Sequence, residues 1–381
     1  MKIVCAASVL YAEEAFGTLG EVRVLSDRLI SHADLRDADA LIVRSKTTVD
    51  AMLLDRTRVA FVGTTTSGTD HLDLDYLNPS PLAWCAAPGC NANSVSEYVA
   101  AALCTLAHRR GRTLAGLTLG VVGVGQVGSR VAKKAQALGM RVLLNDPPLA
   151  VATGDPVYLP LERVLRESDA ITLHVPLARR GQYPTFRMAN CGFFAKVKAG
   201  CLFLNASRGE VVDEEALLFA LEHGAVSHAV LDVWNNEPFV EPHVLEKVAL
   251  GTPHIAGYSF EGRLNGTLAV YRELCHFLEV EPSWAPPQNP AAPGPVIAVD
   301  ARGKSEEAVL WETVHRAYDI EVDDRALRQT LILDRASRGV RFDALRRDYP
   351  ERREFPARQV RLEHAEPAIA ERIAALGFGV A

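Results

Sequence analysis

Three side chains that together could oxidise an alcohol stand in short polar segments, each directly after a run of apolar residues. Arg208, Glu237 and His254 occupy the segments NASRG, DVWNNEP and TPHIAGY. Oxidation of an alcohol beside a carboxylate needs a guanidinium to hold the carboxylate, an imidazole to take the hydroxyl proton, and an acid to orient the imidazole. Each residue alone also fits a structural role, as a helix cap, a turn acid or a loop histidine. Their occurrence on successive segments is what indicates catalysis.

A glycine-rich turn earlier in the chain predicts a dinucleotide site. Gly123, Gly125 and Gly128 follow the apolar run LGVV and open a helical stretch, and Asp146 stands eighteen residues after Gly128. In such a motif the glycines allow a tight turn, close approach of a pyrophosphate and close packing of helix on strand. The helix start adds free N–H groups for the phosphates. The Asp146 carboxylate would bind ribose hydroxyls and repel a 2′-phosphate, so NAD is favoured over NADP.

The elements that must position these residues form two alternating series. Short runs rich in Val, Ile and Leu alternate with helical stretches over 2–85 and again from residue 119, which is typical of parallel α/β units. A long helix is predicted over 94–108, with Ser94 and Glu97 as a capping box. Six prolines between 282 and 295 favour an extended spacer, and residues 296–381 predict a small α+β domain.

Composition excludes several classes of protein. The net charge of −6 and the pI near 6.0 give no overall attraction to nucleic acid or to an anionic membrane. No apolar stretch reaches the ~20 residues that span a bilayer. The seven cysteines include no C-x-x-C pair, so the sequence predicts neither a metal site nor a disulfide framework, and a reducing cytoplasm fits best.

The chain resembles the D-2-hydroxyacid dehydrogenase family from its start to about residue 280. The resemblance is carried by GVVGVGQVG, HVPL, NASRGEVVDEEAL, LDVWNNEP and TPHIAGYS. It implies an α/β fold of two Rossmann-like doubly wound parallel-sheet lobes plus a small C-terminal α+β dimerisation domain. The expected domains are a substrate-binding lobe over 1–95 completed by 255–281, an NAD-binding Rossmann domain over 96–254, a proline-rich linker over 282–295 and the dimerisation domain over 296–381.

The resemblance also implies roles for individual residues. Arg208, Glu237 and His254 are expected to be catalytic, and Ser45, Thr66 and Tyr258 are expected to contact the substrate. The expected NAD contacts are Gly123, Gly125, Gln126, Val127, Gly128, Asp146, Val175, Ala206, Ser207, Arg208, Asp232 and Gly257. Position 175 is often Thr in the most similar branch of the family and is Val here, so a contact there is expected through the backbone.

Further segments indicate that branch. FVGTTTSGTDHLD, APGCNANSVSEYV and HRAYDIEVDD resemble enzymes that act on a phosphorylated 2-hydroxy acid. The resemblance implies NAD-dependent oxidation of 4-phospho-D-erythronate to (R)-3-hydroxy-2-oxo-4-phosphooxybutanoate, in the biosynthesis of pyridoxal 5′-phosphate. Two alternatives stay open. One is another D-2-hydroxyacid dehydrogenase, of the phosphoglycerate or hydroxypyruvate/glyoxylate type, and the other is a non-enzymatic NAD-sensing regulator on the same fold.

The hydroxyl-rich run Thr64–Thr69 follows the apolar run VAFV. Glycines at 63 and 68 allow a tight loop of exposed N–H groups, which suits a carboxylate or a phosphate as well as a plain polar turn. Asp70 and His71, just beyond it, are expected to fix the loop rather than to act as a catalytic pair.

The C-terminal segment is expected to make a homodimer. The apolar helix face around Val309, Leu310 and Val314 offers a surface for a two-fold contact. The charged run from Glu351 to Glu354 is most simply a solvated, self-paired cluster. The sharper hypothesis is that Arg352 or its neighbour Arg353 reaches an adjacent active site and binds the substrate phosphate.

Overall fold

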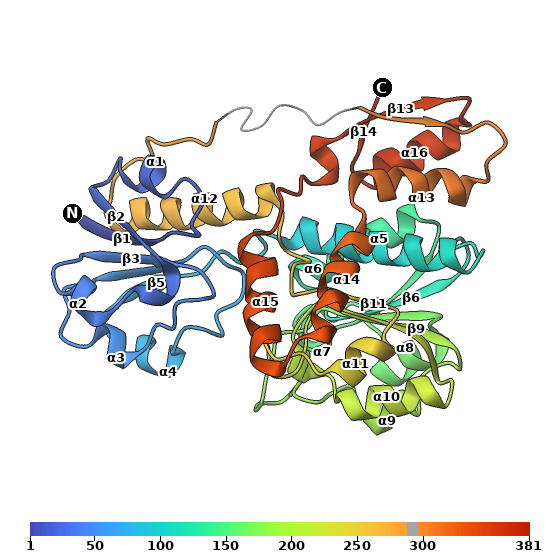
Figure 1. The fold of residues 1–381 in the computed structure, drawn as a ribbon, viewed down its shortest axis with the longest axis horizontal. Coiled ribbons are helices and arrows are strands. Elements are labelled where there is room, and N and C mark those ends of the chain that lie inside the picture. Colours follow the sequence, from blue (N-terminus) through green and yellow to red (C-terminus); the bar gives the residue numbers. More distant parts are fainter. Residues whose placement is uncertain (288–295) are drawn as a thin grey trace. The chain divides into compact units, whose positions relative to one another are not determined.

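The computed structural model describes residues 1–287 and 296–381. Residues 288–295, the larger part of the predicted proline-rich linker, lie outside the described residues. The chain forms two compact units, one from Met1–Ala92 with Tyr258–Ala292 and the other from Asn93–Gly257 with Pro293–Ala381. Figure 1 labels most of the helices and strands of both units.

The first unit is a five-stranded parallel sheet in the order β2-β1-β3-β4-β5. Its strands are β1 (Lys2–Ala6), β2 (Glu21–Leu25), β3 (Ala40–Val43), β4 (Phe61–Thr64) and β5 (Ala83–Cys85). Its helices are α1 (Ala12–Phe16), η1 (Asp27–Leu29), α2 (His32–Leu35), α3 (Ala51–Leu54), α4 (Leu74–Leu77) and α12 (Phe260–Phe277). The central strands β3 and β4 are buried along their whole length, as continuous apolar runs predict.

The late helix α12 completes the core of the first unit. Its buried face, which includes Val270, Tyr271 and Leu274, packs into the same cluster as strands β1, β3 and β4. Figure 1 shows this helix beside the sheet of the first unit. The Tyr271 hydroxyl also accepts hydrogen bonds from the backbone N–H groups of Ser283 (3.0 Å) and Trp284 (2.9 Å). The start of the proline-rich segment is therefore fixed on this unit.

The second unit contains a six-stranded parallel sheet in the order β11-β10-β9-β8-β6-β7. Its strands are β6 (Thr118–Val122), β7 (Arg141–Asn145), β8 (Ala170–Leu173), β9 (Cys201–Asn205), β10 (Val226–Leu231) and β11 (Leu250–Gly251). The connecting helices are α5 (Ala92–Arg109), α6 (Gln126–Ala137), α7 (Pro147–Thr153), α8 (Leu161–Glu167), α9 (Cys191–Phe194), η2 (Gly209–Val211), α10 (Glu214–Glu222) and α11 (Pro242–Lys247). The chain reverses direction across the sheet between β6 and β8, which is the switch point where such sheets bind ligands.

The C-terminal segment packs within this second unit and adds a small three-stranded parallel sheet, β12-β13-β14. Its elements are β12 (Ile297–Asp300), α13 (Glu306–Ala317), α14 (Ile320–Arg328), η3 (Gln329–Ile332), α15 (Arg335–Arg347), η4 (Phe355–Ala357), β13 (Gln359–Glu363), α16 (Pro367–Ala375) and β14 (Gly379–Val380). The helix α14 and the strand β14 were not predicted. The apolar face of α13 is not available to a second copy, because Val309, Leu310 and Val314 are buried within the chain.

The predicted capping box at the start of the long helix is wrong. Helix α5 begins at Ala92, before Ser94, and the Ser94 hydroxyl donates to the backbone oxygen of Ala256 (2.9 Å) instead of capping the helix. Glu97 accepts hydrogen bonds from the Asn93 side chain (2.8 Å) and from the backbone N–H of Phe355 (2.8 Å). Ser94 and Glu97 thus both contact distant parts of the chain, and the two side chains do not form a capping box.

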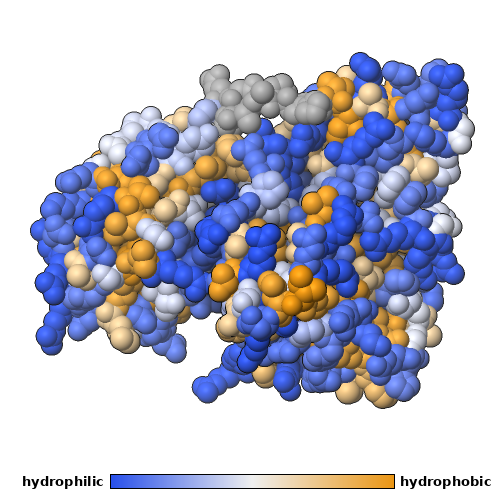
Figure 2. Space-filling model, viewed as in Figure 1, coloured by the Kyte–Doolittle hydropathy of each residue, from blue (hydrophilic) through white to orange (hydrophobic). Residues whose placement is uncertain are grey.

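No helix among the described residues is long and apolar enough to cross a membrane. Hydrophilic residues cover most of the face seen in Figure 2, with smaller hydrophobic groups between them. All seven cysteines are free thiols in this structure.

Candidate active site

The predicted cofactor and catalytic residues between 123 and 257 all follow strands of the six-stranded sheet. The glycine turn follows β6, Asp146 follows β7, Val175 follows β8, residues 206–208 follow β9, and the segments with Glu237 and His254 follow β10 and β11. The strands are parallel, so their carboxyl ends meet at one edge of the sheet. This edge is where open α/β sheets bind ligands.

The glycine turn fits a dinucleotide. Gly123 has φ +86°, and a Cβ on Gly128 would lie 2.0 Å from the Gly123 oxygen, so the fold itself requires both glycines. A Cβ on Gly125 would meet no protein atom within 4 Å. Packing therefore gives no reason for glycine at 125, whereas close approach of a pyrophosphate to the backbone does. Gln126 and Val127 open helix α6 directly after this turn.

Asp146 links the glycine turn to the end of β7. One carboxylate oxygen accepts a hydrogen bond from the Val124 N–H (2.8 Å), and the other caps α7 by accepting from the Leu149 N–H (3.0 Å). The side chain is half-buried, and each oxygen keeps a second lone pair. These remaining acceptor positions suit ribose hydroxyls.

Val175 lies against the glycine turn, beside a histidine that is not suited to proton transfer. A Cβ on Gly123 would lie 2.9 Å from a methyl group of Val175. Burial lowers the pKa of the adjacent His174 to about 3, and its Nε2 pairs with the Thr172 hydroxyl (2.9 Å). His174 is therefore neutral near pH 7 and serves the packing of the loop.

The loop after β9 is folded around the side chain of Asn205. Its amide oxygen accepts from the N–H (3.0 Å) and the hydroxyl (2.7 Å) of Ser207, and its amide nitrogen donates to the Arg208 oxygen (2.9 Å). The Arg208 guanidinium in turn donates to the Ser207 oxygen (2.7 Å). Asn205, which sequence reasoning did not select, thus fixes the backbone that carries Ala206, Ser207 and Arg208.

Asp232 organises the loop that carries His254. Its buried carboxylate accepts hydrogen bonds from the Thr252 hydroxyl (2.7 Å) and from the N–H groups of Ile255 (2.8 Å) and Ala256 (2.9 Å). Its backbone oxygen accepts from the His254 N–H (2.7 Å). Burial raises the pKa of Asp232, against the opposing effect of these donors and of His254. The side chain thereby holds the turn between Thr252 and Gly257, where His254 has φ +56°.

Glu237 and His254 form a hydrogen-bonded pair. The Glu237 Oε2 atom lies 2.7 Å from His254 Nδ1, and Oε1 accepts from the Trp234 N–H (3.0 Å). Burial acts to raise the pKa of Glu237, but the charge and hydrogen bond of His254, with the charge of Arg346, hold that pKa below its ordinary value. Among the described residues, His254 Nε2 makes no hydrogen bond, and about a third of the side chain (32%) is exposed. The pair therefore presents one oriented imidazole nitrogen.

The three expected substrate contacts belong to the first unit. Ser45 is exposed after β3, Thr66 follows β4, and the Tyr258 ring lies under the guanidinium of Arg44 (5.5 Å from its centre). The Thr66 hydroxyl pairs with the Thr64 hydroxyl (2.8 Å), which His71 also contacts (2.9 Å). These contacts agree with the expectation that His71 fixes the hydroxyl-rich loop.

The charged run near the C-terminus is not a solvated cluster. Arg352 is only 7% exposed and Glu354 only 6%. The Arg352 guanidinium donates to the backbone oxygens of Ala256 and Ser94 and lies 4.4 Å from the centre of the Tyr318 ring. Arg352 is thus engaged inside its own chain, which corrects the expectation that it reaches an adjacent active site.

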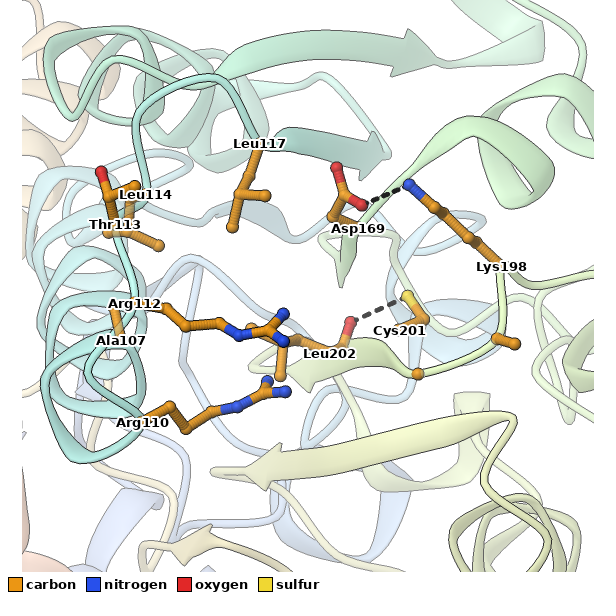
Figure 3. Close-up of a pocket in the computed structure, with 12 residues that line it drawn as sticks. Ala107, Arg110, Arg112, Thr113, Leu114, Leu117, Asp169, Lys198, Cys201 and Leu202 are labelled. Carbon is orange, nitrogen blue, oxygen red and sulfur yellow. Dashed lines mark hydrogen bonds and ion pairs between the residues drawn. The ribbon is translucent and has the colours of Figure 1, made fainter.

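A cavity of about 420 Å³ lies at the opposite edge of the six-stranded sheet (Figure 3). Its lining includes Leu117, Asp169 and Cys201, which stand at the amino ends of β6, β8 and β9. Lys198 is paired there with Asp169 (2.5 Å), and the side chains of Arg110 and Arg112 extend into the hollow (Figure 3). None of the predicted site residues lines it.

Comparison with known proteins places this geometry in a family. Residues 92–256 match the model described as D-isomer specific 2-hydroxyacid dehydrogenase, NAD binding domain, and residues 292–377 match a domain of unknown function, DUF3410. A D-lactate dehydrogenase from Aquifex aeolicus, solved with NAD and lactic acid, has 27% identity and a TM-score of 0.61. That match covers 73% of this chain and 96% of that chain.

Relatives named erythronate-4-phosphate dehydrogenase match almost the whole chain. The protein from Salinibacter ruber is 43% identical, with 97% of each chain covered, and the one from Edwardsiella ictaluri is 44% identical, with 99% of each covered. This chain therefore belongs to the NAD-dependent D-isomer specific 2-hydroxyacid dehydrogenase family, in the branch that holds the erythronate-4-phosphate dehydrogenases.

Proposed function

We propose that this chain oxidises 4-phospho-D-erythronate to (R)-3-hydroxy-2-oxo-4-phosphooxybutanoate with NAD, as a step in the biosynthesis of pyridoxal 5′-phosphate. The observation that carries the chemistry is the Glu237–His254 pair, 2.7 Å apart, with the imidazole Nε2 unengaged among the described residues. The names of the relatives over nearly the full length support the choice of substrate.

His254 is the general base of the proposed reaction. Its Nε2 takes the proton of the C2 hydroxyl as the hydride leaves C2, and the electron pair of the O–H bond becomes part of the new carbonyl. Glu237 holds Nδ1 by a hydrogen bond, so the ring is oriented and its positive charge is balanced after it takes the proton. NAD, when bound, supplies the hydride acceptor.

Arg208 binds the substrate carboxylate, for which its planar guanidinium offers two parallel donors. Gly123, Gly125, Gln126, Val127 and Gly128 would hold the pyrophosphate, and Asp146 would hold the ribose hydroxyls. Val175, Ala206, Ser207 and Gly257 belong to the proposed cofactor loops at the same sheet edge. Asp232 acts through the backbone of its neighbours, because its hydrogen bonds hold Ile255 and Ala256.

Ser45, Thr66 and Tyr258 remain proposed substrate contacts. Hydroxyl groups and exposed N–H groups of the loop after β4 suit the oxygens of a carboxylate or phosphate. Replacement of Thr66 by Val keeps its shape and removes its hydroxyl, so KM for the phosphorylated substrate is expected to rise while the affinity for NADH stays the same.

We also propose that the protein works in the cytoplasm as a homodimer joined through residues 296–381. Free cysteines throughout suit a reducing compartment. The C-terminal segment has the exposed apolar side chains Val322 (50%), Ile332 (90%) and Val340 (72%), which a contact with a second copy would cover. Light scattering on Ile332→Glu is expected to show dissociation, whereas Val151→Glu, at a site 75% exposed on α7, leaves the dimer intact.

The function is tested with a panel of 2-hydroxy acids and NAD, followed by NADH absorbance. The panel holds 4-phospho-D-erythronate, D-erythronate without phosphate, 3-phosphoglycerate and D-glycerate. We expect the highest kcat/KM for 4-phospho-D-erythronate. A clear preference for another acid would assign a different dehydrogenase, and NADH binding without oxidation of any acid would favour the NAD-sensing regulator.

A further inference from the structure

The C-terminal segment contacts the loops that carry the proposed catalytic pair, and all of these contacts lie within the second unit. Helix α14 covers β11, which is the edge strand of the six-stranded sheet. The Asp324 carboxylate accepts a hydrogen bond from the Gly251 N–H (2.8 Å). Because β11 is an edge strand, no neighbouring strand is present to accept this hydrogen bond. Arg328 donates to the oxygens of Leu245 and Val248 (2.7 Å each). The strand that leads into the His254 loop is therefore anchored from the C-terminal segment.

The loop with Glu237 has a second anchor in the same segment. The buried Arg338 of α15 donates to the Val240 oxygen (3.0 Å), three residues after Glu237. The Arg335 guanidinium lies 5.0 Å from the centre of the Phe239 ring. Arg346 of the same helix contributes positive charge that stabilises ionised Glu237. Helix α15 thus contacts the residues that directly follow Glu237 in the chain, namely Phe239 and Val240.

Arg352 supplies the third anchor, at the turn after His254. Its Nη2 atom donates to the Ala256 oxygen and to the Ser94 hydroxyl, and it also lies 3.4 Å from the Ser94 oxygen. The Ser94 hydroxyl donates to the same Ala256 oxygen (2.9 Å), while the Ala256 N–H is held by Asp232 (2.9 Å). The peptide units on both sides of Ala256 are therefore fixed, two residues from a histidine in the left-handed region of φ.

The buried arginines in these anchors reduce the free energy of unfolding, whereas an attachment made by apolar side chains would not. A buried guanidinium loses its hydration and destabilises the fold unless its hydrogen bonds and charges are satisfied. Apolar side chains of similar size would attach the segment without that cost. Arg338 and Arg352 instead direct Nη donors at backbone oxygens near Glu237 and His254, although Nε of both and Nη1 of Arg352 are buried without a hydrogen-bond partner among the described residues. The contacts that are made fix the direction of those backbones.

We infer that the C-terminal segment 296–381, most of which matches the domain of unknown function, is a brace within each chain that sets the geometry of the Glu237–His254 pair, with Arg352 as its principal positioning residue. This inference rests on the proposed function of that pair. It assigns the segment a role in catalysis that is separate from any role in dimerisation. Arg352 touches neither substrate nor cofactor in this account and acts through the backbone of Ala256.

The test compares Arg352→Met with Arg352→Lys and with the matched control Arg361→Met. Arg361 lies on β13 of the same segment, with a side chain that is 60% exposed. We expect kcat of Arg352→Met to fall roughly 10- to 100-fold, because a displacement of about 1 Å in a reacting group has effects of that size. The dissociation constant of NADH for Arg352→Met should match that of the wild type. The control Arg361→Met should match the wild type in kcat, in the dissociation constant of NADH and in the thermal unfolding midpoint. Arg352→Lys should recover a large part of kcat, because it keeps a charged donor.

Each outcome decides the inference. It is overturned if Arg352→Met turns over within twofold of the wild type, or if its NADH affinity falls in proportion to kcat, since that pattern indicates general loss of the fold. If Arg352→Met does not fold, Arg338→Met is assayed with the same readouts and the same criteria. All variants are measured on whichever acid the wild type oxidises, so a wrong choice of substrate would appear in the wild type and not in this comparison.

Discussion

The glycine turn and the Glu237–His254 loops lie at the same edge of one sheet, yet different parts of the chain hold them in place. The turn is fixed by residues close to it in sequence, through the Val124–Asp146 hydrogen bond and the contact of Gly128 with the Gly123 oxygen. The loops depend on partners such as Arg338 and Arg352, which lie about a hundred residues later. Cofactor binding and chemistry should therefore respond separately to substitution.

Loss of the general base should have the largest effect. In His254→Gln the side chain keeps a hydrogen-bonding group but cannot take the proton, so kcat is expected to fall roughly 10²- to 10⁴-fold. The affinity for NADH, measured by fluorescence titration, should stay within about twofold of the wild type. Near-normal turnover would remove His254 from the mechanism.

Replacement of the orienting acid should have the next largest effect. Glu237→Gln keeps a hydrogen-bond acceptor but removes the charge that balances the imidazolium, and kcat is expected to fall about 10- to 100-fold. The pKa of Glu237 lies below its ordinary value, so this charge is present throughout the working range. The affinity for NADH should stay within about twofold of the wild type. Turnover that stays near normal in Glu237→Gln would contradict the catalytic pair.

The carboxylate contact should be sensitive to the shape of the cation. Arg208→Lys keeps the positive charge but loses the two parallel donors, so kcat/KM is expected to fall about tenfold or more. The expected loss appears mainly in KM for the hydroxy acid, and the affinity for NADH should change little. An unaltered kcat/KM would show that Arg208 does not bind the substrate.

A substitution beside the glycine turn, at Asp146, should give the smallest change in turnover. Asp146→Ala removes the carboxylate that repels a 2′-phosphate, so the ratio of kcat/KM with NAD to that with NADP should narrow. The pH profile should keep the wild-type form, because the Glu237–His254 pair is untouched. A wild type that already prefers NADP would disprove the reading of this motif.

The sequence was sufficient to predict those elements whose structure is determined by residues close together in the chain. Continuous apolar runs predicted the strands of both large sheets except the two-residue strand β11, and the glycine motif predicted the turn after β6, because these signals lie within a few residues of one another. Helix α14 was missed because its buried side includes Asp323 and Asp324, so apolar periodicity does not reveal it. A helix that buries carboxylates in place of apolar side chains has the sequence pattern of a charged loop.

The positions of some polar side chains could not be read from the sequence, because distant partners decide them. Arg352 stands in a run of four charged residues, which is typical of a solvated surface, yet it is buried against Ser94 and Ala256. Ser94 fits a helix cap by its spacing to Glu97, yet its hydroxyl binds Ala256. Only the fold brings these three residues together.

The most direct test of the account is a double-mutant cycle on Glu237→Gln and His254→Gln, with NADH formation followed in single turnovers at saturating NAD and 4-phospho-D-erythronate. Residues that act as one unit are strongly non-additive, so the double variant should transfer hydride at about the rate of His254→Gln alone. Its affinity for NADH should match the wild type. Rate losses that multiply, or NADH affinity that falls with the rate, would contradict a catalytic pair that is separate from the cofactor site.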